Sequence, residues 1–249
     1  MKVPWDELDG SKGSTLSALD LPHQPKTANP LTRTSSLDAS DFNKVPGSQW
    51  RIAPGSYIAF SLDLEALDQP VIASYEASMG LVMLHSRPRK YLGLVLRSHS
   101  KRFGENVVEY LSVHLVGNST PKGDLDHWAP IESPSPVHAH EPHPDPARAP
   151  LKMKAGSLFP WNGLRQWTTA GVELVVTHYH DGKIGIALDD DDLQRVEDYS
   201  ADDYWQLRQL GSEGVHVPEI HLPAKVWRNP HGVDHNLENF FEDIEILKE

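Results

Sequence analysis

The chain has 249 residues, a formal net charge of −12 and no cysteine. This length allows one large domain or two small ones, and the lack of cysteine excludes disulfides, thiolate metal ligands and a cysteine nucleophile. The acidic balance argues against a general nucleic-acid coat.

The first 48 residues are rich in Ser, Thr, Pro, Asp and Lys and show no hydrophobic period, so we expect a disordered tail over 1–48. The opening "MKVPWDELDGSKGST" has no apolar core of signal-peptide length, and nowhere do about 18 apolar residues run together. We therefore expect no membrane span and a cytoplasmic or nuclear protein.

The segment after the tail alternates in the manner of β-strands. "YIAFSLDL" places Ile58, Phe60, Leu62 and Leu64 on one face. Four β-rich runs follow, and the spacing between them is too short for crossover helices, so neighbours should pair antiparallel. "RSHSKRFGEN" is predicted to connect a long hairpin. The four runs are "VIASYEA", "GLVMLH", "KYLGLVLRS" and "NVVEYLSVHLVG".

Residues 118–160 carry nine prolines, which remove backbone donors and disfavour both sheet and helix, so we expect a long irregular loop. "GVELVVTHYHDGKIGIAL" then returns to strand, with Asp181-Gly182 as a hairpin turn. After Leu188 the chain becomes acidic and helical.

Two helices are predicted in the last third of the chain. Ser200 and Asp203 have the spacing of a capping box, and Gly211 would end that helix. The segment 233–249 is an amphipathic helix with an acidic outer face. Its apolar residues are Leu237, Phe240, Phe241, Ile244 and Leu247.

The predicted fold class is mainly β, a β-rich α+β domain built as an antiparallel sandwich or a distorted barrel, with one or two packed helices. The domain would span 49–232, including the Pro- and His-rich loop at 118–160. The disordered tail 1–48 would precede it, and the acidic helix 233–249 would follow.

Fourteen histidines raise the question of a metal site. In "VHAHEPHPDP", His138 and His140 would share a face in a strand, whereas a polyproline II helix would align His140 with His143. A solvated, semi-rigid linker is the preferred interpretation of this segment. In "THYHDG", His178 and His180 would share a strand face with Val172, Leu174 and Val176, although the register of the following turn decides whether they enter a pocket.

A metal-dependent hydrolase or oxygenase is the alternative function. His178 and His180 would be the first ligands of zinc or iron, and His114, His138 or His140 would complete the shell. Each residue also has a structural interpretation: a solvated strand end for His178 and His180, and a satisfied core histidine for His114. No cofactor is firmly predicted.

The remaining motifs give weaker indications of a function. "LDDDDLQ" lacks the glycine and ligand spacing of an EF-hand and suits a helix N-terminus. No GxSxG, Walker A or GxGxxG motif is present. Basic residues gather between 87 and 102, where they would meet a phosphate-bearing or acidic partner or the acidic C-terminal third of the same chain. These are Arg87, Arg89, Lys90, Arg97, Lys101 and Arg102.

The preferred function is a non-catalytic binding or interaction protein that presents loops and a Trp-rich surface to a protein or a small-molecule ligand. The acidic last helix would pack on its own sheet rather than in a partner's groove. Nucleic acid is not expected as a partner, and the sequence does not fix the oligomeric state. The surface would consist of Trp128, Trp161, Trp167, Trp205 and Trp227.

Overall fold

The computed structural model describes residues 51–66, 88–104, 106–119, 126–132, 142–180, 182, 185–210 and 221–248. The predicted tail 1–48 and the predicted strands "VIASYEA" and "GLVMLH" lie outside these ranges. The elements in chain order are β1 (Tyr57–Leu62), the 3-10 helix η3 (Leu64–Ala66), β2 (Tyr91–Phe103), β3 (Asn106–Gly117), β4 (Trp128–Pro130), β5 (Arg165–His180), α2 (Asp190–Gln209), β6 (His221–Trp227) and α3 (Leu237–Lys248).

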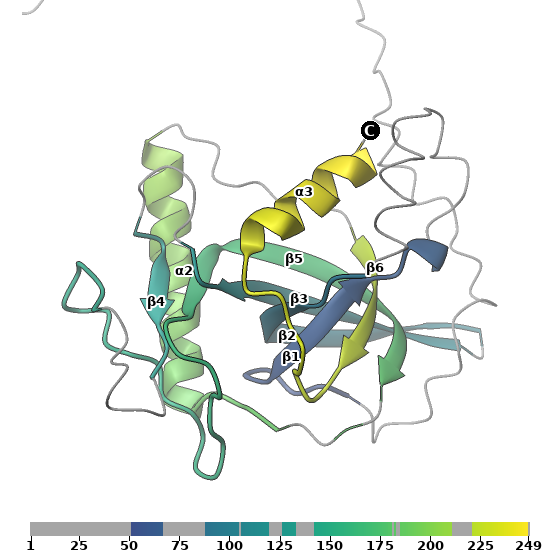
Figure 1. The fold of residues 1–249 in the computed structure, drawn as a ribbon, viewed down its shortest axis with the longest axis horizontal. Coiled ribbons are helices and arrows are strands. Elements are labelled where there is room, and N and C mark those ends of the chain that lie inside the picture. The colour runs from purple at the N-terminus through teal and green to yellow at the C-terminus, as the bar shows by residue number, and fades with distance from the viewer. Residues whose placement is uncertain are drawn as a thin grey trace, which may run out of the picture.

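Five strands close into a barrel in the order β3-β2-β1-β6-β5, because β5 also pairs with β3 (Figure 1). The short strand β4 adds to β5 outside this ring. The mainly β prediction and its barrel alternative are therefore confirmed. The barrel is mixed, however, since β5 and β6 pair in parallel while all other pairs are antiparallel. The helix α2 lies between β5 and β6 in the chain and supplies the crossover that a parallel pair needs.

The β2–β3 hairpin is longer than predicted. Residues 97–103, expected to form a connection, continue β2 and pair with β3 as far as Phe103 opposite Asn106. Gly104 adopts a φ of +61° at the turn, a conformation that glycine reaches without steric cost.

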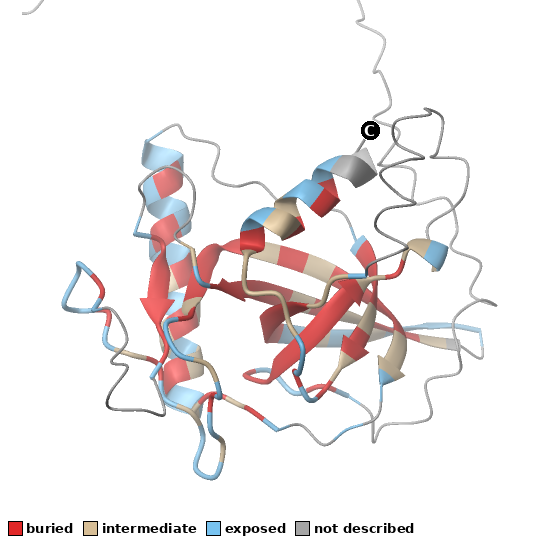
Figure 2. Cartoon of the chain, in the orientation of Figure 1, coloured by how far each residue is buried: buried red, intermediate tan, exposed pale blue. Residues whose placement is uncertain are grey.

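The barrel interior holds the main hydrophobic core, and the alternation of β1 explains part of it: Ile58 and Phe60 point inward with Leu62 packed against them. Leu64, expected on the same strand face, instead belongs to η3. The barrel strands are largely buried except in the second half of β2, where residues 97–103 are exposed or half-buried (Figure 2).

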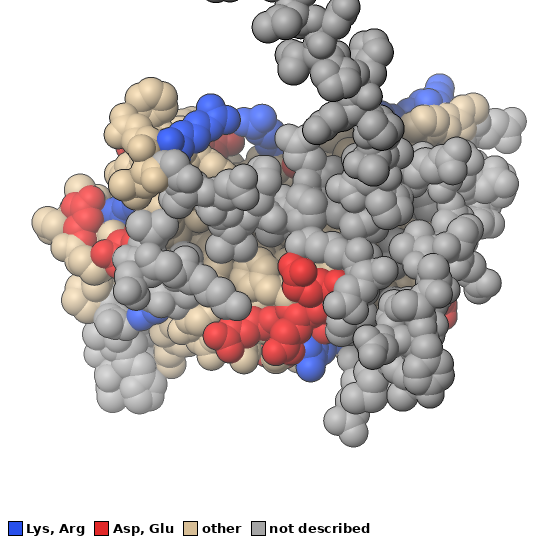
Figure 3. Space-filling model, turned by 90° about the horizontal axis from the view of Figure 1, so that it is seen from above, with Lys and Arg blue, Asp and Glu red and all other residues tan. Residues whose placement is uncertain are grey.

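The helix α3 covers the barrel with its apolar face, and Leu237, Phe240 and Ile244 are buried in the interior core. Asn236 caps this helix by accepting a hydrogen bond from the Glu238 amide at 3.1 Å. The outward face is acidic, and Figure 3, which looks onto the side where α3 lies, shows acidic side chains near its middle. The prediction that this helix packs on its own sheet is confirmed.

The helix α2 begins ten residues before the predicted capping box. Asp189 is its N-cap, with three aspartates in the first turn, so "LDDDDLQ" is a helix N-terminus as expected. The capping box at Ser200 and Asp203 is wrong, because both residues are buried in mid-helix. A second apolar cluster lies outside the barrel, where Val196 of α2 packs with strand and loop residues including Leu92, Leu94 and Leu151.

Two loop predictions differ from the structure. The Pro-rich region 118–160 contains β4 and a parallel bridge between Ile131 and Leu151. The predicted hairpin after Asp181 is also wrong: Asp181 itself is outside the described residues, but Ala187 bridges to Ser56 and Leu188 to Met153 rather than to β5. Neither described helix is long and apolar enough to cross a membrane.

Candidate functional site

The predicted metal ligands do not meet in the part of the chain that the structure describes. His114 on β3 pairs with Gly171, whereas His178 lies seven residues further along β5, a separation of about 23 Å at 3.3 Å per residue. His138 and His140 lie outside the described residues. The described residues contain no group of three or more His, Asp or Glu side chains able to hold a metal ion.

His114 is a buried core histidine. Its side chain packs against the backbone of Gly171, where a Cβ would lie 3.1 Å from the imidazole Nε2. Burial lowers the pKa of His114 to about 4, opposed by a hydrogen bond to the Trp167 backbone. The imidazole is therefore neutral at pH 7 and part of the packing.

His178 and His180 face away from the barrel interior, which corrects the prediction that they share the face of Val172, Leu174 and Val176. A β-bulge between Val176 and His178 shifts the alternation by one residue, so that Tyr179 packs against the interior core instead. His180 stacks on Trp227 at a centroid distance of 4.2 Å. His178 places Nδ1 3.5 Å from Asp63 Oδ2.

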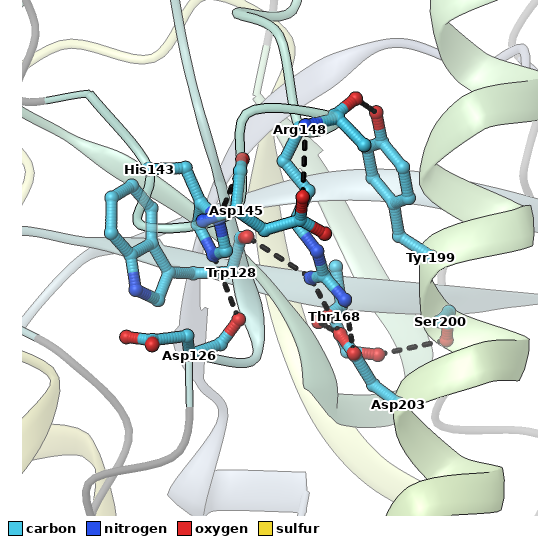
Figure 4. A network of polar contacts seen from close by, with 10 residues as sticks. Asp126, Trp128, His143, Asp145, Arg148, Thr168, Tyr199, Ser200 and Asp203 are labelled. Atoms are coloured by element: carbon cyan, nitrogen blue, oxygen red, sulfur yellow. Dashed lines mark hydrogen bonds and ion pairs between the residues drawn. The ribbon is translucent and has the colours of Figure 1, made fainter.

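His143, from the Pro-rich stretch "VHAHEPHPDP", is a structural residue (Figure 4). Its Nδ1 accepts a hydrogen bond from the Asp145 amide, and its Nε2 donates to the Asp126 carbonyl, both at 2.9 Å. The ring also packs edge-on against Trp128. Both ring nitrogens are occupied, so His143 cannot ligate a metal without losing these bonds. The solvated-linker interpretation is wrong at this residue because His143 is 8% exposed.

Next to His143, a buried ion pair fastens the loop 142–150 to α2 (Figure 4). The Arg148 guanidinium binds both carboxylate oxygens of Asp203 and donates to the Trp128 carbonyl at 3.2 Å. Thr168 of β5 donates to the same carboxylate. Asp203 of α2 is fully buried and its partners come from the loop and from β5, so this group holds three segments together.

The described residues form a cavity of about 170 Å³ where β1 ends and η3 begins. Charged side chains from η3, β6, α3 and the residues just before η3 and β2 converge on it, together with apolar contacts. Ligand sites have this character, concave with a few converging polar groups, and the volume suits a small molecule. The lining residues are Leu62, Asp63, Leu64, Glu65, Pro88, Arg89, Tyr91, Lys225 and Asp243.

Asp63 is the most constrained group in this cavity. Its backbone amide donates to the Pro223 carbonyl at 2.8 Å, and its Oδ2 accepts from the Thr177 hydroxyl at 2.5 Å. Lys225 Nζ lies 3.2 Å from Oδ1 and forms an ion pair with the buried carboxylate, which raises the pKa of Lys225 against the effect of desolvation. Asp63 therefore has a partner for each of its carboxylate oxygens.

The opposite side of the cavity is built by a second ion pair. Arg89 Nη1 lies 3.1 Å from Asp243 Oδ1, and the Tyr91 hydroxyl donates to Asp243 Oδ2. Burial raises the pKa of Asp243, although Tyr91 and Arg89 both oppose this shift. Arg89 thus meets the acidic C-terminal helix of its own chain, one of the two alternatives that the basic run 87–102 left open.

The Trp-rich surface is not formed as predicted. Trp128 and Trp167 are buried, Trp161 and Trp227 are half-buried, and Trp205 is exposed. The large apolar area of tryptophan favours burial, and this gain exceeds the cost of burying the indole N–H group. The number of tryptophans in a sequence therefore does not predict an exposed aromatic surface.

Sequence reasoning missed the residues that line the cavity, because they come from four separate segments of the chain. The alternation in "SLDLEAL" places Asp63 on the face opposite Leu62 and Leu64, so the local pattern predicts an outward acid and does not indicate that Asp63 is buried.

Comparison with known proteins found no matching family model, no matching curated protein and no matching solved structure, so the assignment of a function depends on the geometry alone.

Proposed function

We propose that the chain is a non-catalytic binding protein whose barrel holds a small polar ligand in the cavity beside Asp63. The observation that supports the proposal is the cavity of about 170 Å³, onto which five charged side chains converge together with apolar ones. A concave site with a few converging polar groups is typical of small-molecule binding.

The surrounding contacts favour binding in a preformed site. Asp63 is fixed by Thr177 and the Pro223 carbonyl, and Asp243 is fixed by Tyr91 and Arg89. Groups held in this way lose little freedom when a ligand arrives. We place the protein in the cytoplasm or nucleus, because a chain without cysteine suits a reducing compartment.

Ligand-detected NMR with mixtures of small polar molecules tests the proposal. Leu64 is half-buried and lines the cavity, so Leu64→Trp should fill it and abolish the binding signals seen with the wild type. Leu158 is exposed and remote from the cavity lining, which makes Leu158→Trp the matched control that keeps those signals. The proposal fails when no molecule binds the wild type at millimolar concentration, or when Leu64→Trp retains every ligand.

A further inference from the structure

We propose that the free edge of the β2–β3 hairpin binds an acidic peptide segment of a partner protein, which adds to the sheet as an extra strand. The first observation is the open edge itself. On the side of β1, Val95 is the last residue of β2 with backbone hydrogen bonds, which join it to Gly55 and Ser56. Beyond Val95, residues 97–103 pair with β3 alone among the described residues, and the hairpin extends past the rest of the barrel (Figure 1).

This edge is long enough to pair with a new strand. In an antiparallel pair, every second residue directs its backbone N–H and C=O groups away from its partner strand. Residues 97–103 span about 23 Å at 3.3 Å per residue. Strand addition to an exposed sheet edge obtains its affinity from such backbone groups. The surface lies on the hairpin, so this inference does not depend on the cavity beside Asp63.

The second observation is the charge along the edge. Arg97, Lys101 and Arg102 have exposed side chains, and none of the three forms an ion pair with another described residue. The Lys101 ammonium group lies over the Tyr110 ring, 5.0 Å from its centroid. The sequence has no acidic residue between 87 and 102. The edge is therefore a cationic strip on a protein whose net charge is −12.

The pattern of exposure indicates where the acids of the peptide would lie. Arg97 and Lys101 are exposed, whereas Ser98 and Ser100 are half-buried, as expected when alternate residues of a strand share a face. A peptide with an acid at every second position would place these acids beside Arg97 and Lys101. Phe103, 47% exposed, adds apolar contact at the end of the strip.

The open backbone and the charge together favour this occupant over two others. A second copy of the chain would bring two cationic edges together, and like charges on neighbouring strands destabilise a sheet. A nucleic acid would pair its phosphates with the cations but would leave the backbone groups of the edge without strand partners. An acidic strand pairs with both the cations and the backbone.

Titration of the full chain with synthetic peptides tests the proposal. The probe is the acetylated and amidated peptide EVEVEVE, and its counterpart of opposite charge is KVKVKVK. At matched ionic strength, protein-detected NMR should show saturable binding of the acidic peptide, at least about tenfold tighter than that of the basic peptide. Hydrogen exchange over 97–103 should become slower when the acidic peptide is bound.

Two N-methylated versions of the acidic peptide test whether its backbone takes part. In an extended peptide, the N–H groups of the glutamates point to one side and those of the valines to the other. One version carries N-methyl groups on three valines, and the other carries them on three glutamates. An added strand directs only one of these sets at β2, so one version should bind as the parent does and the other should lose binding. Equal behaviour of the two versions would show that the peptide does not pair as a strand.

Two charge reversals make the result specific to this edge. Lys101→Glu should weaken binding of the acidic peptide at least about fivefold, because it replaces an attraction with a repulsion. Arg208→Glu is the matched control, since Arg208 is also exposed but lies in the last turn of α2. It should change the affinity by less than about twofold.

Four results would overturn the proposal. The first is no saturable binding of the acidic peptide at millimolar concentration, and the second is equal binding of the basic peptide or unchanged affinity in Lys101→Glu. Tighter binding of a single-stranded oligothymidine than of the acidic peptide would assign the strip to nucleic acid instead. Protection of 97–103 that rises with the concentration of the wild type alone would assign the edge to a second copy.

Discussion

His114 shows how a single buried side chain sets the response of this protein to acid. Its pKa is lowered to about 4 in the native state by burial, against an ordinary value of 6.5. Between these two pH values the unfolded chain binds a proton at this residue and the native chain does not. The stability contributed by neutral His114 is therefore complete above pH 6.5 and is lost as the pH falls to about 4, by about 3 kcal/mol in total.

The prediction compares the pH dependence of stability in the wild type and in the variant His114→Gln. His114→Gln cannot titrate, so its free energy of unfolding should fall less steeply between pH 6.5 and pH 4 than that of the wild type, as measured by urea denaturation at a series of pH values. Other titrating groups contribute equally to both curves and cancel. Parallel curves over this range would show that His114 gains its proton in the native state as readily as in the unfolded state.

The position of α3 depends on the close approach of its first residue, Leu237, to Gly117, which has no Cβ. A Cβ placed on Gly117 of β3 would lie 2.4 Å from Leu237 Cγ and 2.9 Å from the His235 carbonyl oxygen. Gly117→Ala should therefore displace the start of α3 and lower the free energy of unfolding by about 1–3 kcal/mol. Hydrogen exchange should locate the effect, with faster exchange over 237–248 than over β2.

A second substitution identifies the cause. Leu237→Ala alone removes core packing and should cost about 2–5 kcal/mol, but in the Gly117→Ala background it also removes the clash. The double variant should then be more stable than the sum of the two single effects predicts. Strict additivity would mean that the new methyl group finds space without moving Leu237.

The elements themselves differ in how far the sequence predicted them. Local patterns were sufficient where a segment's neighbours lie close in the chain or where one apolar face is clear: the alternation of β1, the β2–β3 pair, and the apolar face of α3. Local patterns failed where contacts with residues distant in the chain determine the structure. Ser200 and Asp203 have capping-box spacing, yet the Thr168 carbonyl accepts the Ser200 hydroxyl and Arg148 binds Asp203. The bulge before His178 likewise depends on pairing with β6.

For the molecule as a whole, the closed barrel and the cavity both require contacts that no local pattern encodes. The parallel β5–β6 pair brings Thr177 and Lys225 to Asp63, which directly follows β1, and the return of α3 brings Asp243 to Arg89. The cavity is thus a product of barrel closure. A histidine-rich segment can be recognised in the sequence, whereas the residues of this cavity cannot, because they become neighbours only in the folded barrel.

The Arg148–Asp203 pair tests how much the assembly of loop, barrel and helix depends on one buried charge. Arg148→Ala leaves the Asp203 carboxylate, which is 0% exposed, without its cation, so the free energy of unfolding should fall by about 3–5 kcal/mol. Arg148→Met combined with Asp203→Leu removes both charges and keeps apolar volume, although the Trp128 carbonyl and the Thr168 hydroxyl lose a partner. We therefore expect the double variant to recover at least half of the loss in urea denaturation. A double variant as unstable as Arg148→Ala would show that the hydrogen bonds of this group, rather than the uncompensated charge, hold the three segments together.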